Sequence, residues 1–390
     1  MKIAVVCDSF KGSLTSKDAC AAVKDGLLRC NKNFEVLSLP FADGGEGTSR
    51  CFYDILGGRL RKAAVHDPLL REITAEYTVL PDGTAVIDVA SASGLTLLKS
   101  SERDAVKMSS LGSGELICDA AEHGAKHIIL GLGGSATTDA GTGILYALGM
   151  RFFSEDGVEV LPDGQNMIRV KKIRRTENFE RFKDIKFTLA CDVTNPLCGE
   201  NGAAYVFSPQ KGASKNDVKL LDDGLRNIGE IFEKASGKKI INLPGAGAAG
   251  GIGGGLSAFL NCELQSGFDV LARAASLEDK IRRSDAVITG EGKTDRQTLF
   301  GKLPKRVSDI AEKFGVPCIL LSGDVENDIS AEKLGVCEIH KIKENGISLE
   351  HCMKNAASLL SERAFAIGKD SKIINKQYSR KQEKMRENER

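Results

Sequence analysis

The sequence has no paired-cysteine motif, no long apolar run and almost no net charge. Its 11 cysteines include no Cys-x-x-Cys pair, which argues against a disulfide framework and against a zinc site. No run approaches the roughly 18–20 apolar residues of a membrane span. The short apolar start reaches Asp8 at once, unlike a signal peptide. A formal charge of +1 gives no reason to expect nucleic acid or a membrane as partner. We therefore expect a cytoplasmic protein that acts on small molecules, and oligomeric state is left open.

The standard nucleotide-binding motifs are missing or incomplete. The Walker string G-x-x-x-x-G-K-[ST] is absent, because Gly301-Lys302 lacks both the upstream glycine and the following hydroxyl. Two strings fit the dinucleotide pattern, at Gly245–Gly250 and Gly131–Ala136. The first follows Pro244 and runs into further glycines, and the second lacks a following strand that ends in an acid. Both the P-loop and the dinucleotide-binding interpretation are weakly supported.

Both ends of the chain alternate strand-like and helix-like segments, whereas the middle does not. This alternation predicts α/β architecture with a parallel sheet covered by helices. In the middle, closely spaced strand-like runs indicate a meander or a mixed sheet. The simplest organisation is one domain built from both chain ends, with a second domain inserted, and two domains in sequence order are the alternative. The expected strands are 3–7, 34–39, 60–65, 73–80, 85–89, 127–130, 187–191, 203–207, 285–289, 318–321 and 337–339, and the expected helices are 16–28 (with Ser16 as N-cap), 48–56, 104–123, 215–235 and 305–314.

Four strand-like runs end in loops rich in glycine, hydroxyls and acids. Ligands of open parallel sheets bind beyond the carboxyl ends of strands, where loop N–H groups bind anions. Carboxylates beside them suit Mg²⁺ with a phosphate, and lysines suit developing negative charge. None of these loops contains histidine, so a general base would be Asp or Glu. The loops therefore predict phosphoryl transfer, and they are Asp8–Ser13, Gly131–Asp139, Cys191–Pro196 and Gly290–Asp295.

Seven motifs together resemble the type I glycerate kinase family. They follow one another in order between residue 1 and about residue 368, so the similarity covers nearly the whole chain. Thr138 is a modest departure, since we expect Asn at this position in many members of the family. The motifs are Asp8–Ser13, Ala42–Thr48, Gly131–Asp139, Cys191–Pro196, Phe207–Ala213, Gly245–Gly251 and Gly290–Asp295.

The resemblance implies an activity and a domain arrangement. The activity is ATP- and Mg²⁺-dependent phosphorylation of D-glycerate, with transfer to O2 giving 2-phosphoglycerate and ADP; transfer to O3 is the alternative. The resemblance also implies two α/β domains with the active site in the cleft between them. We assign residues 1–65 plus 276–368 to a flavodoxin/Rossmann-like domain, 66–275 to an inserted mixed α/β domain, and 369–390 to a charged, disordered tail. An NAD-dependent dehydrogenase and a non-catalytic sensor of small acids are the competing functions.

Each candidate site residue has a structural alternative. Asp192, Lys11 and Asn195 are the catalytic candidates, although Asp192 and Asn195 also suit an Asx-turn before a proline. Asp43 and Glu46 are the metal candidates, although acids there also suit a helix N-terminus.

The remaining candidates divide between two ligands. Hydroxyl groups near Thr138 also suit helix capping, and a lone lysine is often only solvated. The substrate or phosphate candidates are Ser9, Gly133, Gly134, Ser135, Thr137, Asp139 and Lys211, and the nucleotide candidates are Gly290, Glu291, Gly292, Asp295 and Lys302.

Overall fold

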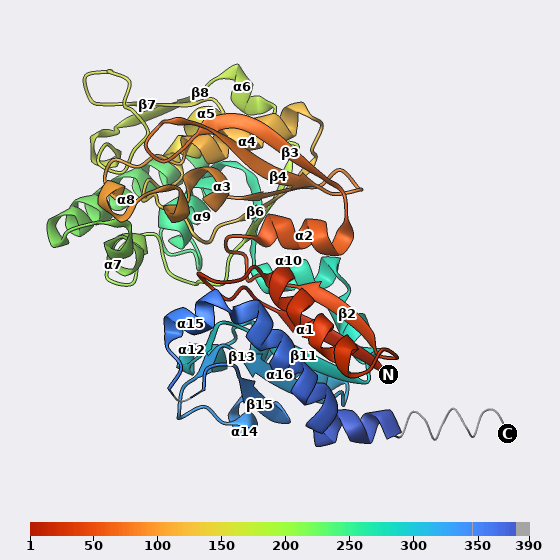
Figure 1. Cartoon of the computed structure of the whole chain (residues 1–390). Helices are drawn as coiled ribbons and strands as arrows, with labels where there is room; N and C mark the ends of the chain where they lie inside the picture. Colours follow the sequence, from red (N-terminus) through yellow and green to blue (C-terminus); the bar gives the residue numbers. More distant parts are fainter. Residues whose placement is uncertain (345, 380–390) are drawn as a thin grey trace. The chain divides into compact units, whose positions relative to one another are not determined.

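The computed structural model describes residues 1–344 and 346–379, which form two compact units (Figure 1). The terminal unit consists of Met1–Asp43 and the chain from Leu271 onward, and the inserted unit is Gly44–Val270. The first boundary therefore follows residue 43 instead of the expected 65. The reason is that β3 (Arg59–His66) pairs along its whole length with β4 (Glu72–Val79), so both strands belong to the inserted unit. Among the described residues, no helix has the length and apolar character to cross a membrane.

The terminal unit contains a five-stranded sheet in which every pairing is parallel. Its strand order is β15-β13-β11-β1-β2. The three central strands, β1, β11 and β13, are almost entirely apolar and buried, as expected for parallel strands covered on both faces, whereas the edge strands β2 and β15 are partly exposed. The chain proceeds from β1 toward one edge and from β11 toward the other, so the order reverses between β1 and β11. The bounds are β1 Lys2–Cys7, β2 Glu35–Pro40, β11 Ala286–Gly290, β13 Cys318–Ser322 and β15 Glu338–Lys341.

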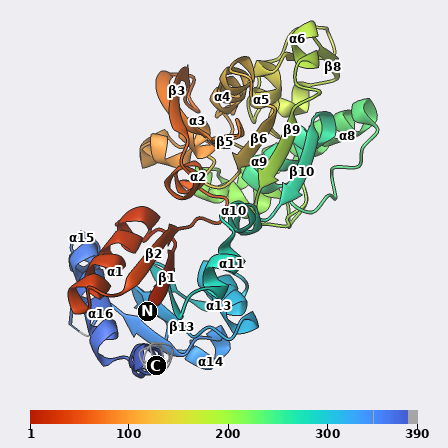
Figure 2. The ribbon, with the colours of Figure 1, turned by 90° about the vertical axis from the view of Figure 1, so that its right-hand side faces the viewer.

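Helices cover both faces of this sheet, with α1 (Ser16–Cys30) and α16 (Ala356–Asp370) on one face and α11 (Leu277–Arg282) and α13 (Leu303–Lys313) on the other (Figure 2). The cap of α1 is Thr15, whose hydroxyl accepts the Asp18 N–H, and not the expected Ser16. The shorter elements are α12 Arg296–Leu299, α14 Ala331–Leu334, α15 Leu349–Lys354 and the two-stranded pair β12 Lys293–Thr294 with β14 Asp324–Val325.

The prediction of a disordered tail is wrong for residues 372–379. Residues 372–379 are helical, and the Ile374 side chain is fully buried in the core of the terminal unit. The Ser371 hydroxyl donates to Glu338 at 2.9 Å, and the Tyr378 ring meets the Phe34 ring edge-on with centroids 5.9 Å apart. The charge of this segment lies on its exposed face. The rest of the expected tail, 380–390, lies outside the described residues.

The inserted unit contains a six-stranded mixed sheet in the order β10-β9-β6-β5-β4-β3. The four strands from β10 to β5 are parallel, and β5, β4 and β3 form an antiparallel meander. The predicted mixed sheet is therefore confirmed. Its remaining strands are β5 Ala85–Asp88, β6 His127–Gly131, β9 Lys186–Ala190 and β10 Asn261–Gln265, and a separate antiparallel pair consists of β7 Met150–Phe153 and β8 Lys172–Arg175.

Two expected elements of the inserted unit differ from the structure. Residues 203–207 form a helix, α7, instead of a strand: Ala203 and Ala204 are both buried while Tyr205 and Val206 are exposed, a pattern that a strand cannot produce. The helix expected from 104 begins only at Leu111. The helices are α2 Thr48–Leu56, α3 Ala90–Ser93, α4 Leu111–Glu122, α5 Thr142–Ala147, α6 Glu177–Glu180, α7 Ala203–Phe207, α8 Lys215–Ser236, α9 Ala248–Phe259 and α10 Gly267–Ala274, with 3₁₀ turns at Leu95–Leu97, Ser100–Glu102, Met167–Arg169 and Pro209–Lys211.

The buried Ile374 gives a test of the ordered C-terminal helix. Ile374→Ala should lower the free energy of unfolding by about 2–5 kcal/mol, because it removes buried methyl groups and leaves a cavity. Lys376→Ala, at an exposed position of the same segment, is the matched control and should change little. The measurement is thermal and urea unfolding followed by circular dichroism. Equal stability of the two variants would show that the segment does not belong to the core.

Candidate functional site

In the terminal unit, loops from adjacent strands pack backbone against backbone at the carboxyl edge of the sheet. Cys7 of β1 pairs with Gly290 of β11, so Asp8 and Glu291 are the next residues on neighbouring strands. A Cβ at Gly290 would lie 2.3 Å from the Leu321 carbonyl oxygen. No side chain fits at that distance, so the glycine is needed for the loops to meet. This edge is also the point where the strand order reverses, which is where open α/β sheets bind ligands.

A cavity of about 710 Å³ opens at this edge, entirely within the terminal unit. Its lining combines polar and charged side chains with apolar ones. The volume is in the range of small-molecule sites. The cavity brings together most of the candidates that belong to this unit: Ser9, Lys11, Asp43, Glu291, Gly292, Asp295 and Lys302 all line it, with Asp8, Phe10, Lys293, Asp324, Ile342, Lys343, Leu349, Cys352, Met353 and Ala356 among the other lining residues.

Asp8 is a site residue that the sequence-based candidates omitted. Burial, helped by the negative charges of Asp43 and Glu291, raises the pKa of Asp8 to about 7, although the Ser9 N–H and Lys11 act in the opposite direction. Its carboxylate accepts the Ser9 N–H at 2.6 Å. Asp8 directly follows β1 and begins the first of the four loops. This position in the sequence could have identified it as a candidate site residue.

Two nucleotide candidates also stabilise their own loop. Glu291 accepts hydroxyl hydrogen bonds from Thr294 at 3.0 Å and Thr298 at 2.7 Å, and burial raises its pKa. Asp295 caps α12 by accepting the Gln297 N–H at 2.9 Å, and it forms an ion pair with Lys302 at 3.3 Å. The Gly290–Lys302 segment is therefore held in shape before any ligand binds.

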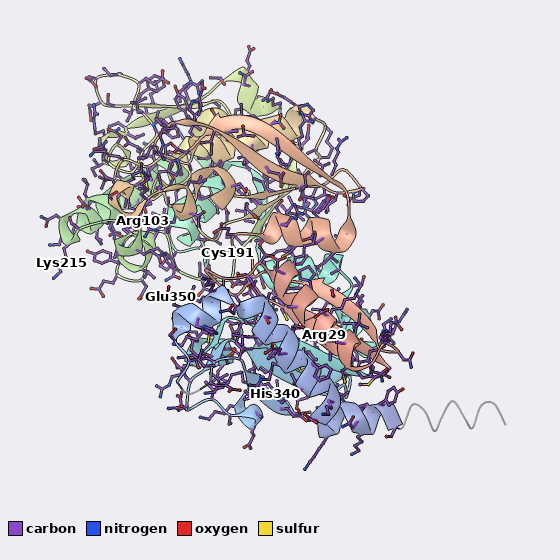
Figure 3. All side chains as sticks on the ribbon, in the orientation of Figure 1. Arg29, Arg103, Cys191, Lys215, His340 and Glu350 are labelled. Carbon is purple, nitrogen blue, oxygen red and sulfur yellow. The ribbon has the colours of Figure 1, made fainter. Side chains whose placement is uncertain are left out.

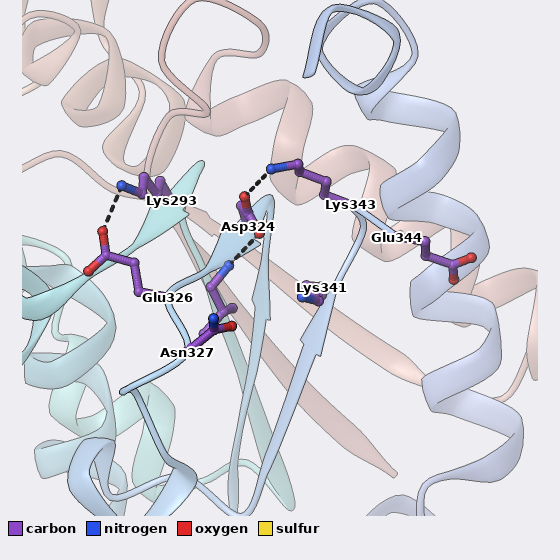
Figure 4. Close-up of a pocket in the computed structure, with 8 residues that line it drawn as sticks. Lys293, Asp324, Glu326, Asn327, Lys341, Lys343 and Glu344 are labelled. Atoms are coloured by element: carbon purple, nitrogen blue, oxygen red, sulfur yellow. Dashed lines mark hydrogen bonds and ion pairs between the residues drawn. The ribbon is translucent and has the colours of Figure 1, made fainter. Parts of the chain in front are cut away.

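A second pocket of about 400 Å³, shown in Figure 4, shares Lys293, Asp324 and Lys343 with the lining of this cavity. Lys293 pairs with Glu326 at 2.8 Å, and Lys343 pairs with Asp324 at 2.6 Å. Both lysines line both pockets, and their charges are matched by these acids. They therefore offer less free positive charge to an anion than Lys11 does.

In the inserted unit, a row of paired residues marks the carboxyl edge of the parallel strands. Asp88, Gly131 and Ala190 are in register across β5, β6 and β9. The Gly44–Gly47 segment lies along this row, since the Gly133 N–H donates to the Gly44 carbonyl oxygen at 3.0 Å. A Cβ at Gly133 would lie 2.5 Å from the Gly45 Cα, which explains the glycine at this candidate position.

Asp88 is a second buried acid that the candidates omitted, and it anchors this segment. Its carboxylate accepts the N–H groups of Gly47 and Ser49, both at 2.9 Å, and so caps the N-terminus of α2. Burial raises its pKa to about 7 although these hydrogen bonds act in the opposite direction. Only the position of Asp88 at a strand end could have indicated it.

The predicted metal pair, Asp43 and Glu46, falls at the boundary of the two units, with one residue in each. Asp43 lines the cavity of the terminal unit with Asp8, whereas Glu46 is an exposed residue of the inserted unit that accepts the Thr96 hydroxyl at 3.3 Å. Capping by these acids is also not observed, because Asp88 fills that role for α2. Among the described residues, no three His, Cys, Asp or Glu side chains are placed to hold a metal ion.

The Lys211 side chain contacts candidate residues of the Gly131–Asp139 loop. It is 2% exposed, and its Nζ donates to the Ser135 hydroxyl at 3.0 Å and the Thr137 carbonyl oxygen at 2.6 Å. Burial lowers the pKa of Lys211 to about 7. The buried Thr137 hydroxyl has no hydrogen-bond partner in the described structure. These groups are suited to binding an oxyanion: a buried ammonium, an unpaired hydroxyl and the loop backbone at Gly134, which has φ +79°.

Asp139, one of the substrate or phosphate candidates, has a structural role in the inserted unit. Its fully buried carboxylate accepts the Ser110 N–H and hydroxyl and the N–H groups of Gly141 and Gly143, at 2.7–3.2 Å. These groups lie at the N-termini of α4 and α5. The capping alternative therefore describes Asp139, and it holds two helices in place behind the loop.

The two catalytic candidates of the inserted unit follow β9, in the loop where Figure 3 labels Cys191. Asp192 is exposed, immediately after the buried end of the strand. The Asn195 amide donates to the Asn201 carbonyl oxygen at 2.8 Å, which braces the loop. Lys11, the third candidate, belongs to the terminal unit. Asp192 is thus the accessible acid of this loop, and Asn195 supports its shape.

Comparisons with known proteins agree along the whole chain. The model of the glycerate kinase family matches residues 3–372. A glycerate kinase from Halalkalibacterium halodurans is 38% identical over 93% of this chain and 96% of its own, and a glycerate 2-kinase from Escherichia coli is 41% identical over 84% and 87%. A solved structure from Salmonella typhimurium LT2, assigned as glycerate kinase 2, has 35% identity and a TM-score of 0.83, covering 94% of this chain and 97% of that chain. The seven motifs, the α/β architecture and these similarities together show that the chain belongs to the glycerate kinase family and is an enzyme of that kind.

Proposed function

We propose that this protein transfers the γ-phosphoryl group of ATP to O2 of D-glycerate, giving 2-phosphoglycerate and ADP in the cytoplasm as a step of organic-acid catabolism. The observation that carries the proposal is the cavity of the terminal unit. It combines carboxylates, lysines and glycine backbone at the point where the strand order reverses. Phosphoryl transfer depends mainly on positioning and charge stabilisation, and these groups supply both.

ATP is assigned to this cavity. Lys11 and Lys302 supply positive charge for the phosphates, and Gly292 lets the loop that carries Glu291 pack closely on the backbone of Phe10. The Asp295–Lys302 ion pair keeps the lysine directed at its loop before the nucleotide arrives. Donors from neighbouring strand ends thus replace the single loop of a P-loop kinase.

The acids of the same cavity fit a magnesium ion that accompanies ATP. Asp8 and Asp43 lie close enough for the charge of one to raise the pKa of the other, and such like-charged carboxylates favour a cation between them. Mg²⁺ is commonly bound through one or two carboxylates plus substrate phosphates, so a three-acid cluster is not needed. Bound there, the ion would neutralise phosphate charge. Asp8 and Asp43 replace the Asp43 and Glu46 pair as its proposed ligands.

Glycerate is assigned to the Gly131–Thr138 loop of the inserted unit. The Lys211 ammonium and the hydroxyls of Ser135 and Thr137 suit its carboxylate, and Lys211 is already oriented by its two hydrogen bonds. Asp192 is the proposed general base that accepts the proton of the attacking hydroxyl, because it is the accessible carboxylate at the end of β9. The relative from Escherichia coli, a glycerate 2-kinase, supports O2 as the acceptor.

The purified protein should release ADP only when ATP, D-glycerate and Mg²⁺ are all present. A coupled assay measures the release, and EDTA should abolish it. Phosphorus NMR of the product should show 2-phosphoglycerate. A 3-phosphoglycerate signal would contradict the choice of O2 alone, whereas no ADP release under any of these conditions would contradict the kinase activity.

Asp192→Asn should reduce kcat by about 10²–10⁴-fold, because the amide cannot accept the hydroxyl proton. Asp223→Asn on α8 is the matched control, since Asp223 is an exposed acid of the same unit outside the proposed site. Circular dichroism and thermal unfolding should show that both variants are folded. A folded Asp192→Asn enzyme with the kcat of the control would remove Asp192 from the mechanism.

The lowered pKa of Lys211 leads us to expect that kcat/KM for D-glycerate depends on pH. With a pKa of about 7 in the free enzyme, Lys211 is charged below pH 7 and loses its charge above it, while the glycerate carboxylate stays ionised throughout. We therefore expect kcat/KM for D-glycerate to fall above pH 7 by up to about tenfold per pH unit. Lys211→Arg keeps a positive charge at every accessible pH and should lose this dependence. The same fall in a folded Lys211→Arg enzyme would assign the titration to another group.

A further inference from the structure

The cavity of the terminal unit has an apolar wall that the proposed phosphate chemistry does not use. Leu349 and Met353 lie one helical turn apart on α15, where they are 60% and 37% exposed. Residues four apart share one face of a helix, and both line the cavity. Phe10, Ile342 and Cys352 continue the same wall as largely buried side chains. We call Leu349, Met353 and these neighbours the α15 shelf.

The α15 shelf is fixed to the loop that follows β1. The Ser13 hydroxyl donates to the Met353 carbonyl oxygen at 2.6 Å. A Cβ at Gly12 would lie 3.0 Å from the Met353 Cε, so the methionine side chain packs directly over this glycine. The Ser348 hydroxyl accepts the His351 N–H at 3.2 Å and caps the helix. The shelf is therefore preformed, and it packs against the loop that carries Lys11.

One cavity thus offers two chemically different walls to a single ligand. The charged wall carries Lys11 and Lys302 with the acids Asp8 and Glu291, and the shelf is apolar. A single exposed leucine is ordinary on a protein surface. A leucine and a methionine that line the same cavity as several lysines and acids instead suit a ligand with a flat apolar body and an anionic tail.

Resting on the proposal that this cavity takes ATP, we propose that the purine base lies on the α15 shelf against Leu349 and Met353. The phosphates then extend toward Lys11 and Lys302, which line the same cavity. Burial of the base against the two exposed side chains removes apolar surface of both partners from water. The shelf contributes to affinity for the nucleoside part and not for the phosphate part, and this difference can be measured.

Isothermal titration calorimetry with two probes, ADP and inorganic tripolyphosphate, separates these contributions. Leu349→Asn and Met353→Gln make the shelf polar at exposed positions and should leave the fold intact. Each should weaken ADP binding by about tenfold, which corresponds to about 1.4 kcal/mol, and leave tripolyphosphate binding unchanged. Leu220→Asn on α8 is the matched control, because Leu220 is a 38% exposed leucine of the inserted unit. Lys11→Met should weaken both probes.

Steady-state kinetics provide a second readout. The shelf variants should raise KM for ATP by about tenfold while KM for D-glycerate stays at the wild-type value. Binding of ADP by the shelf variants with wild-type affinity would overturn the shelf and leave the kinase proposal standing. Equal weakening of ADP and tripolyphosphate would also overturn it, because the effect would then concern the phosphates. A wild-type protein that binds neither probe would instead contradict the proposed nucleotide site itself.

Discussion

Backbone-to-backbone contact between loops is the constraint on which both candidate sites depend. In the terminal unit, a Cβ at Gly323 would lie 2.1 Å from the Gly292 carbonyl oxygen, and in the inserted unit a Cβ at Gly133 would lie 2.5 Å from the Gly45 Cα. No other residue fits at such distances without moving the neighbouring loop. The glycines therefore do more than give flexibility. They let loops from adjacent strands meet, so that acids and lysines from distant parts of the sequence line one cavity or surround one oxyanion.

Burial then gives the ionisable groups at these strand ends unusual properties. Asp8 and Asp88 have pKa values raised to about 7, and Lys211 has a pKa lowered to about 7, with desolvation as the largest cause in each case. Asp88 uses its carboxylate to hold α2, so its burial supports structure. Asp8 lines a cavity beside other acids, and Lys211 keeps one ammonium hydrogen beyond its two hydrogen bonds. Burial thus shifts the pKa of all three groups, and their hydrogen-bond partners make the difference. Asp88 uses its carboxylate to anchor a helix, whereas Asp8 and Lys211 are suited to binding a charged ligand.

The loops and the α/β architecture could be predicted from the sequence, whereas the partners of individual side chains could not. Strand ends are marked in the sequence by apolar runs followed by glycine and acidic residues. For this reason the sequence could predict that Glu291, Lys302 and Lys11 lie near one another. Asp139 could not be assigned, because its partners at Ser110 and Gly143 are set by how two helices meet behind the loop. Ile374 was misjudged because one apolar residue in a charged segment gives no periodic signal, although it fills a core position.

A P-loop gathers its phosphate donors in one continuous segment, whereas the donors proposed for this chain lie at the ends of neighbouring strands. The two designs place different demands on the fold. A single loop needs only its own conformation, but distributed donors need the register of β1, β11 and β13 to be kept, because a shift of one residue would separate Asp8 from Glu291. In β1, β11 and β13, whose side chains are almost all buried, such a shift would also move core side chains to the opposite face. The packing of these strands therefore protects the geometry of the proposed phosphate site.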